Sequence, residues 1–404
     1  MSNRKGYNNN RNISNLIVKI QVYSEFEQKV HSNLNGGILM NQRLTNMSEW
    51  MYQNQVDISI ITSTENVFYL SGFYSDPHER LLALAVFQQE EPILICPAME
   101  KEDAKASGWS YEIIGYSDVE NPWEMVRKAI DKRVNNVSKL AVEKEHMNVE
   151  RYEALSELFP KAAFISAEEN LRKLRMIKDE KEISKIREAC ALADYAVEVG
   201  CSEIKEGKTE LEILAVIEYE LKKKGITKMS FDTMVLTGAN GASPHGTPGL
   251  TKVKKGDFVL FDLGVVVDGY CSDITRTVAY GEINEKQKEI YDTVLKAQLA
   301  AIDASKPGAS CSEVDLTARN IIREAGYGEY FPHRLGHGLG IGVHEYPSLT
   351  ETNPLMLESG MVYTIEPGIY VPNTAGVRIE DDVFVTANGV EILTQFPKEL
   401  QIIK

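Results

Sequence analysis

The chain of 404 residues is long enough for roughly two or three domains, and its composition is that of an ordinary globular protein. Its formal net charge of −15 argues against nucleic acid as the main partner, because phosphate binding requires a basic face. No apolar run approaches the ~20 residues that a membrane span requires, so we expect no membrane partner.

The five cysteines are scattered along the chain, and none belongs to a Cys-x-x-Cys pair. An odd number without regular spacing is typical of free thiols in a reducing compartment rather than of a disulfide framework. We therefore expect a cytoplasmic protein.

The first residues differ in composition from the rest of the chain. Residues 1–39 contain eight asparagines, no periodic element and no compact apolar region of the kind found in secretory signals. Helical spacing begins after Met40, with Leu44, Met47 and Met51. We expect residues 1–39 to be disordered or to be an upstream extension, in which case Met40 would be the natural start.

Residues 40–165 alternate between strand-like and helix-like patterns. The segments 56–61, 81–87 and 92–96 are rich in β-branched and other apolar residues, and 122–134 carry apolar residues on one helical face. These patterns predict an α/β domain with its own core. The domain contains neither a phosphate loop nor a nucleophile elbow.

A break at residues 166–178 reads as a linker to a second domain at 179–404. Asp179 and Glu182 have the spacing of a capping box and predict the start of a long helix. A second helix is expected from about Thr209 to Lys224. Four of the seven histidines follow these helices, so the candidate chemistry lies in the second domain.

Two β-rich runs, 258–267 and 270–278, are joined by Asp268-Gly269. An Asp-Gly pair between two such runs is the strongest short-range indication of a β-hairpin. The two runs therefore predict antiparallel strands with a two-residue turn.

This hairpin would bring two carboxylates together. A two-residue turn pairs Asp262 with Thr275 and Asp273 with Gly264, so both aspartates lie on one face, roughly 7–8 Å apart. That spacing suits a pair of metal ions ~3.5–4 Å apart, and Gly264 would leave space for them. Either aspartate alone could be a surface charge, but two within apolar strands would bury uncompensated charge without a cation. A one-residue bulge would undo the inference.

Three histidines, His333, His337 and His344, lie in a glycine-rich stretch. Glycines beside His337 allow the backbone to approach a site closely, and they disfavour the helical His-Glu-x-x-His site of the zincins. We regard His337 as a candidate metal ligand. The alternative is a surface histidine, or one whose hydrogen bonds are satisfied in the core.

Two distal glutamates, Glu366 and Glu380, lie in apolar, β-prone stretches where a charge is costly. Pro367 should end strand pairing just after Glu366. Arg378 lies two residues before Glu380 on one expected strand, so the two share a face and Arg378 could neutralise or orient the site. For Glu380 alone, a buried ion pair with Arg378 explains the pattern nearly as well.

Together these positions supply four carboxylates and one imidazole. Oxygen-rich sites favour Mn²⁺, whereas imidazole also admits Co²⁺, Zn²⁺ and Fe²⁺. We expect two divalent ions, with Mn²⁺ preferred. The candidate ligands are Asp262, Asp273, His337, Glu366 and Glu380.

The ordered set, with Glu366 in Ile-Glu-Pro-Gly and Glu380 in Arg-Ile-Glu-Asp, resembles the five-ligand signature of the pita-bread metallopeptidases. That family includes methionine aminopeptidase, aminopeptidase P and prolidase. The likeness runs from about residue 178 to the end and implies an α/β (α+β) protein whose catalytic domain has a curved, mainly antiparallel sheet. Residues 40–165 resemble the creatinase-type amino-terminal domain, which methionine aminopeptidases lack. The resemblance therefore implies the proline-specific branch, which hydrolyses Xaa-Pro bonds.

The resemblance also implies a role for each ligand. Asp273 and Glu380 would bridge both ions, Asp262 would bind one ion, and His337 and Glu366 would bind the other. A hydroxide bridging the ions would attack the scissile carbonyl, and Glu366 would carry the proton in that step.

Further residues would contact the substrate. The resemblance implies catalytic roles for His245 and His344, which would contact the substrate and the tetrahedral intermediate, while His333 and Arg378 would line the pocket. In this family the amino-terminal domain of a partner subunit often helps to close the site, so a homodimer is implied.

One position departs from the pattern. Some prolidases carry an arginine directly after His-Glu-x-Pro that grips the free carboxylate of the dipeptide, and here that position is Ser348. We expect an Xaa-Pro dipeptidase, with an aminopeptidase P acting on longer peptides as the alternative. A metal-free creatinase-like amidinohydrolase and a non-enzymatic binding protein share the fold, but they usually lack the ligands present here.

Overall fold

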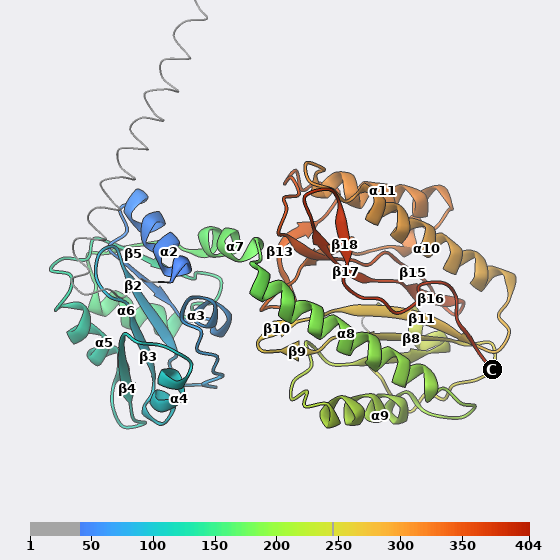
Figure 1. Ribbon diagram of the computed structural model, residues 1–404, viewed down its shortest axis with the longest axis horizontal. Coiled ribbons are helices and arrows are strands. Elements are labelled where there is room, and N and C mark those ends of the chain that lie inside the picture. The colour runs from blue at the N-terminus through green and yellow to red at the C-terminus, as the bar shows by residue number, and fades with distance from the viewer. Residues whose placement is uncertain (1–40, 245) are drawn as a thin grey trace, which may run out of the picture. The chain divides into compact units, whose positions relative to one another are not determined.

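The computed structural model describes residues 41–244 and 246–404. The chain divides into two compact units, one ending at Leu174 and the other beginning at Arg175 (Figure 1). The predictions for residues 1–39 and for His245 fall outside the described residues. Within the described ranges, no helix is long and apolar enough to cross a membrane. All five cysteines are free thiols, as the sequence predicts.

The first unit is built on a six-stranded mixed sheet in the order β4-β3-β2-β1-β5-β6. The central strand β1 is antiparallel to β2 and parallel to β5. Strands β1, β2 and β3 are buried along their whole length, which explains their continuous apolar sequences. The elements are α2 (Gln42–Gln53), β1 (Ile58–Ile61), α3 (Thr64–Ser71), β2 (Ala83–Phe87), β3 (Ile93–Pro97), η1 (Ala98–Glu100), α4 (Lys101–Ala106), β4 (Glu112–Tyr116), α5 (Pro122–Ile130), β5 (Lys139–Val142), α6 (Val149–Leu158) and β6 (Ala163–Ser166).

The first helices of the second unit begin where the sequence predicts. Asp179 caps α8, accepting from the Glu182 N–H while the Glu182 side chain accepts from the Asp179 N–H. Thr209 caps α9 in the same way. Helix α7 occupies most of the segment expected to be a linker. That helix, α7 (Glu168–Met176), spans the division at Leu174, and the helices of the second unit are α8 (Glu180–Ser202), α9 (Glu210–Lys223), η2 (Gly238–Ala242), α10 (Glu285–Ala304), α11 (Cys311–Glu324) and η3 (Gly328–Tyr330).

The strands of this unit form a four-stranded sheet, β19-β11-β8-β7, and a five-stranded sheet, β13-β12-β14-β17-β18, with two small ribbons. Only the β11–β19 pair among them is parallel, so the predicted α/β class with mainly antiparallel pairing is confirmed. The strands are β7 (Met234–Thr237), β8 (Phe258–Leu263), β9 (Val266–Val267), β10 (Tyr270–Cys271), β11 (Ile274–Tyr280), β12 (Gly336–Gly338), β13 (Glu345–Leu349), β14 (Val362–Ile365), β15 (Gly368–Val371), β16 (Ala375–Arg378), β17 (Asp381–Val385), β18 (Val390–Ile392) and β19 (Ile402–Ile403).

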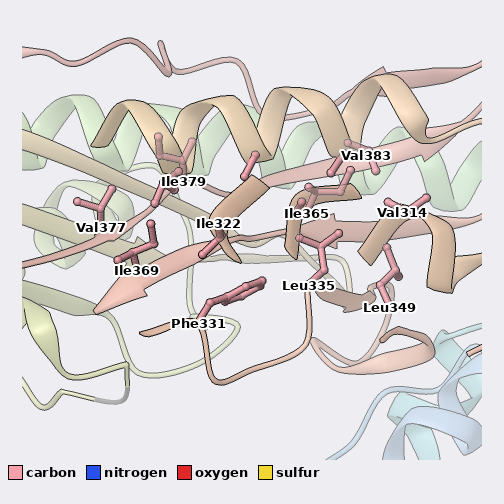
Figure 2. Close-up of a cluster of buried hydrophobic side chains, with 14 of the residues drawn as sticks. Val314, Ile322, Phe331, Leu335, Leu349, Ile365, Ile369, Val377, Ile379 and Val383 are labelled. Atoms are coloured by element: carbon pink, nitrogen blue, oxygen red, sulfur yellow. The ribbon is translucent and has the colours of Figure 1, made fainter. Parts of the chain in front are cut away.

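Two apolar cores hold the second unit together. Helices α8 and α9 pack against β7, β8 and β11, whereas α10 and α11 share a core with the strands from β13 to β17. In Figure 1 the strands lie between α9 below and α10 and α11 above. Figure 2 shows Val314 and Ile322 of α11 gathered with Ile365 and Ile379 in one cluster. The two cores therefore lie on different sides of the strands, because β8 and β11 contribute alternate residues to each of them.

Candidate metal centre

The hairpin that carries Asp262 and Asp273 has the predicted register. Asp262 pairs with Thr275 across β8 and β11, and the same register continues through β9 and β10 to the turn. Asp268 and Gly269 form that turn with φ angles of +47° and +86°, as a two-residue hairpin loop requires. The parity that places both aspartates on one face is therefore preserved.

Gly264 has a different part from the one expected. We expected it to leave space for ions opposite Asp273. Instead, a Cβ atom on Gly264 would lie 1.9 Å from the carbonyl oxygen of Ser272. Glycine is required because the two arms of the hairpin approach closely at the point where the pairing between β8 and β11 is interrupted.

Each candidate carboxylate lies next to a residue of one of the two apolar cores. Successive side chains of an extended segment point to opposite faces, so a core residue on one face directs its acidic neighbour to the other. Two of these neighbours belong to the α8–α9 core and two to the α10–α11 core, which places the carboxylates between the cores. The neighbours are Leu263, Ile274, Ile365 and Ile379.

Three candidate ligands lie close enough to hold one ion. One ligand atom from each of Asp273, His337 and Glu380 lies within 4.8 Å of the other two, and all three residues are buried. The Nε2 atom of His337 is 3.3 Å from Oε1 of Glu366 and 3.8 Å from Oδ2 of Asp273. Segments more than one hundred residues apart in the chain therefore meet here.

Arg378 connects Asp262 to the rest of the cluster. Its Nη2 contacts Oδ2 of Asp262, its Nε donates to Oγ1 of Thr275 at 3.0 Å, and its Nη1 donates to the Tyr370 hydroxyl at 2.6 Å. The Thr275 hydroxyl in turn donates to Oε2 of Glu380 at 2.6 Å. The guanidinium forms its ion pair with Asp262, so the alternative of an Arg378–Glu380 pair does not describe this site.

His337 lies on a strand rather than in a loop. The short strand β12 pairs with β13 on one side and β14 on the other. Cβ atoms on Gly336 and Gly338 would lie 1.8 Å from the Thr364 carbonyl oxygen and 2.3 Å from that of Tyr346. The glycines therefore serve the close approach of neighbouring strands, and the His337 N–H donates to the Thr364 hydroxyl at 3.1 Å.

The other predicted histidines are only partly placed. The His344 ring lies 4.3 Å from the His337 ring, measured between centroids, at an angle of 88°. Nε2 of His333 is 3.0 Å from the Tyr370 hydroxyl, and burial lowers the pKa of His333. His245 lies outside the described residues.

The carboxylates repel one another in the absence of cations. Burial, followed by repulsion from Glu380 and Asp262, raises the pKa of Asp273 well above its ordinary value. Burial, followed by repulsion from Glu366 and Asp262, does the same to the pKa of Glu380. Burial also acts to raise the pKa of Glu366, but His337, His333 and Arg378 together outweigh it and leave that pKa lowered.

Two of the candidate ligands have a buried oxygen that accepts no hydrogen bond from any residue that the structure describes. Oδ1 of Asp262 and Oδ1 of Asp273 have no hydrogen-bond partner among the described residues. A buried carboxylate oxygen without a donor is costly unless a cation binds it. The set of four carboxylates and one imidazole therefore fits hard divalent ions.

Asp382 also contacts the site, although it is not among the residues predicted from the sequence. Its Oδ2 accepts the backbone N–H of Asp273 at 2.8 Å and lies 3.3 Å from Sγ of Cys190. A signal was present, because Glu380, Asp381 and Asp382 are consecutive acidic residues in a stretch that is otherwise apolar. Such a run must pair each buried charge with a different partner.

Two family models match the chain. The Creatinase/Prolidase N-terminal domain matches residues 43–177, and metallopeptidase family M24 matches residues 184–387. The chain belongs to metallopeptidase family M24. The predicted resemblance to the pita-bread metallopeptidases of the prolidase and aminopeptidase P branch is confirmed. The predicted order, a creatinase-type domain followed by the catalytic domain, is confirmed as well.

Relatives cover nearly all of this M24 chain. It is 58% identical over 361 residues to a Bacillus subtilis protein named "Putative dipeptidase YkvY", covering 89% of this chain and 99% of that protein. The prolidase from Pyrococcus horikoshii OT3 is 39% identical with a TM-score of 0.83, over 89% of this chain and 100% of that one. The Xaa-Pro dipeptidase from Bacillus anthracis is 36% identical with a TM-score of 0.84, over 90% of this chain and 100% of that one.

The Ser348 position of this M24 chain has a cation nearby. Ser348 pairs with His337 across β12 and β13, and cross-strand partners share a face. Nη1 of Arg334 donates to Oγ of Ser348 at 3.4 Å. The departure at Ser348 therefore does not leave this part of the site without a positive charge.

Replacing Arg378 should destabilise the chelated protein. Arg378→Met leaves the buried carboxylate of Asp262 without its cation, and we expect unfolding free energy to fall by about 3–5 kcal/mol. Arg378→Lys keeps the charge but loses the planar fork that reaches three partners, so its loss should be smaller. Urea unfolding of the chelated proteins measures both. Equal stability of Arg378→Met and the unmodified protein would contradict the ion pair.

Proposed function

We propose that the chain is a dinuclear metal-dependent Xaa-Pro dipeptidase with Mn²⁺ as the preferred ion. The observation that supports the metal centre is the convergence of three buried carboxylates and the partly buried Glu366 around His337 and Arg378, with an oxygen of Asp262 and one of Asp273 that have no donor among the described residues. One guanidinium offsets one of these negative charges, the imidazole is neutral as a metal ligand, and divalent cations would offset the other negative charges. The similarity to prolidases supports the choice of substrate.

Each ligand would have a distinct part. Asp273 and Glu380 would be shared by both ions, with Asp262 on one ion and His337 and Glu366 on the other. When bound, the ions would supply a hydroxide nucleophile at neutral pH and polarise the scissile carbonyl. The side chain of Glu366 is 16% exposed, which supports the proposal that Glu366 exchanges a proton with water.

Other side chains would hold the substrate. His344, beside His337, would contact the carbonyl oxygen as it becomes an oxyanion, and we assign the same part to His245. His333 and Arg378, joined through the Tyr370 hydroxyl, would line the pocket.

Arg334 is our candidate for binding the free carboxylate of a dipeptide. It brings a guanidinium to Ser348 on the face that His337 shares. A guanidinium can hold a carboxylate with two parallel hydrogen bonds.

A comparison of two substrates tests the proposal. With added Mn²⁺, Ala-Pro should be hydrolysed, and chelation should abolish the activity. Release of free proline measures the reaction. Turnover of Ala-Pro-Pro but not of Ala-Pro would instead indicate an aminopeptidase P. If Mn²⁺ does not bind, a metal-free creatinase-like amidinohydrolase or a non-enzymatic binding protein would be favoured instead.

A variant of Arg334 tests the carboxylate site. Arg334→Met should raise KM for Ala-Pro by about 10–100-fold, because a charge-assisted hydrogen bond is lost. Arg323→Met is the matched control, since Arg323 is half-exposed and pairs with Glu351. An unchanged KM in Arg334→Met would exclude this role.

The expected homodimer and cytoplasmic location stay predictions. Light scattering coupled to size-exclusion chromatography determines the oligomeric state, and cell fractionation determines the location.

A further inference from the structure

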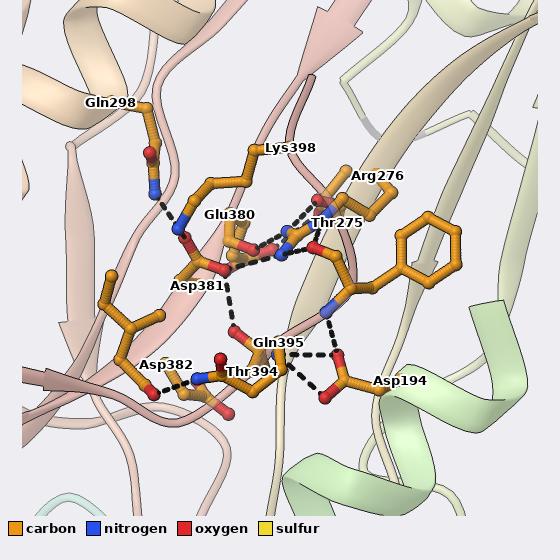
Figure 3. A network of polar contacts seen from close by, with 12 residues as sticks. Asp194, Thr275, Arg276, Gln298, Glu380, Asp381, Asp382, Thr394, Gln395 and Lys398 are labelled. Carbon is orange, nitrogen blue, oxygen red and sulfur yellow. Dashed lines mark hydrogen bonds and ion pairs between the residues drawn. The ribbon is translucent and has the colours of Figure 1, made fainter. Parts of the chain in front are cut away.

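A buried polar network lies directly behind Glu380 (Figure 3). At its centre, Nη2 of Arg276 on β11 is 2.7 Å from Oδ1 of Asp381 at the start of β17, and neither side chain is more than 1% exposed. Asp381 has further donors at 2.5, 2.8 and 2.6 Å, namely Gln298, Thr394 and Lys398. One carboxylate is thus held by two cations and two neutral groups.

Arg276 holds the backbone that presents Glu380. Its Nη1 donates to the carbonyl oxygens of Thr275 and Glu380 at 3.0 and 2.5 Å. The same two residues are bonded to each other, because the Glu380 N–H donates to the Thr275 carbonyl at 3.0 Å. The Thr275 hydroxyl donates to the Glu380 carboxylate. The guanidinium therefore fixes the position of the backbone of Thr275 and Glu380, and with it the position of the Glu380 carboxylate.

The network also holds the segment 394–398, which leads into β19, next to the site. Nε and Nη2 of Arg276 donate to the Phe396 carbonyl at 2.9 and 2.8 Å. Asp194 on α8 accepts the N–H groups of Gln395 and Phe396. Farther along, β19 pairs in parallel with the end of β11, the strand that follows Asp273. The segment thus runs beside both parts of the chain that present the candidate bridging carboxylates.

Lys398 is the accessible part of this arrangement. Its side chain is 16% exposed, whereas that of Asp381 is fully buried. With Arg276 it places two positive charges against one buried carboxylate. Without the Lys398 charge, only Arg276 and neutral donors would hold Asp381 in position. The segment 394–398 would also be bound more weakly to the network.

We propose that Lys398, Asp381 and Arg276 are positioning residues through which the segment 394–398 sets the metal affinity of the centre. This inference rests on the proposed dinuclear function. The residues act through the backbone of Glu380 and not by contact with substrate. A purely structural anchor would stabilise the fold without altering the affinity for ions, and the two roles can be separated by measurement.

Calorimetric titration of the chelated full chain with MnCl₂ provides that measurement. Lys398→Met and Asp381→Asn should bind Mn²⁺ about 10–100-fold more weakly, as is typical when a residue that orients a ligand is replaced. The number of ions at saturation should not change, and excess Mn²⁺ should restore kcat. Lys398→Arg should restore the affinity, because it returns the cation.

A matched control is Arg187→Met, which removes the ion pair between Arg187 on α8 and Glu391 on β18 in the same unit. It should keep the unmodified affinity. Unaltered Mn²⁺ affinity in Lys398→Met, with a loss only in the melting temperature of the chelated protein, would overturn the inference. Lys398→Met decides the matter alone if Asp381→Asn does not fold. Failure of the unmodified protein to bind Mn²⁺ would reject the metal centre and this inference together.

Discussion

Asp273→Asn should abolish Mn²⁺ binding and peptidase activity while making the chelated protein more stable. Asp273 is 4% exposed and one of its oxygens has no donor among the described residues. Burial and repulsion raise the pKa of its carboxyl, so its charged form destabilises the metal-free fold. A neutral amide of the same shape removes that repulsion but is a poor ligand for two ions. Activity should fall by about 10³-fold or more, because the ions supply several kcal/mol of transition-state stabilisation.

Thermal melting with chelator and with Mn²⁺ measures the stability change, and proline release measures activity. Asp268→Asn is the control, since it makes the same substitution in the same hairpin at an exposed turn position that favours asparagine. Full activity of Asp273→Asn, or a lower melting temperature of its chelated form, would contradict the part assigned to Asp273.

The stabilisation that Mn²⁺ gives should grow as the pH rises from about 5 to about 8. The pKa values of Asp273 and Glu380 are raised in the folded protein above their ordinary values of 3.8 and 4.5. Above those ordinary values the folded chelated protein holds more protons than the unfolded chain, so its stability falls with rising pH. Bound ions compete with the same protons, and binding therefore tightens over this range.

The difference in melting temperature between the Mn²⁺-bound and chelated forms is the quantity to follow. At about 100 times Kd the ions contribute about 2.7 kcal/mol. Carboxyls with lowered pKa act in the opposite direction: burial opposes the shift at Glu345, but Arg175 and Lys178 lower its pKa to about 2. Such groups keep their partners in both forms and cancel in the difference. A difference that stays constant across the range would contradict the carboxylate cluster.

The part of the site that follows from local rules could be predicted from the sequence. An Asp-Gly turn and the period of two in a strand determine which face Asp262 and Asp273 occupy, and the register agrees. The capping box at Asp179 is local in the same sense. Both depend on residues close together in the chain, so spacing alone carries the information.

The contacts between distant segments could not be predicted in that way. Which carboxylate Arg378 pairs with depends on how β16 lies against β8, and spacing along one strand indicates only the alternative pair with Glu380. The glycines at Gly264 and Gly336 were read as room for ions, or for approach to a site, but they make room for neighbouring backbone. Nothing in the local spacing marks Asp381 and Asp382, because their partners lie far away in the sequence.

The position of the carboxylates between two cores has a mechanical consequence. The α8–α9 core holds Leu263 and Ile274 beside one pair of acids, and the α10–α11 core holds Ile365 and Ile379 beside the other. Each pair of acidic residues is therefore attached to a different set of helices, and the four carboxylates lie where the two halves of the unit meet. A divalent ion shared by Asp273 and Glu380 would cross-link the two halves, as a disulfide cross-links two loops. Loss of the ion would remove this cross-link and leave carboxylates of the two halves to repel each other.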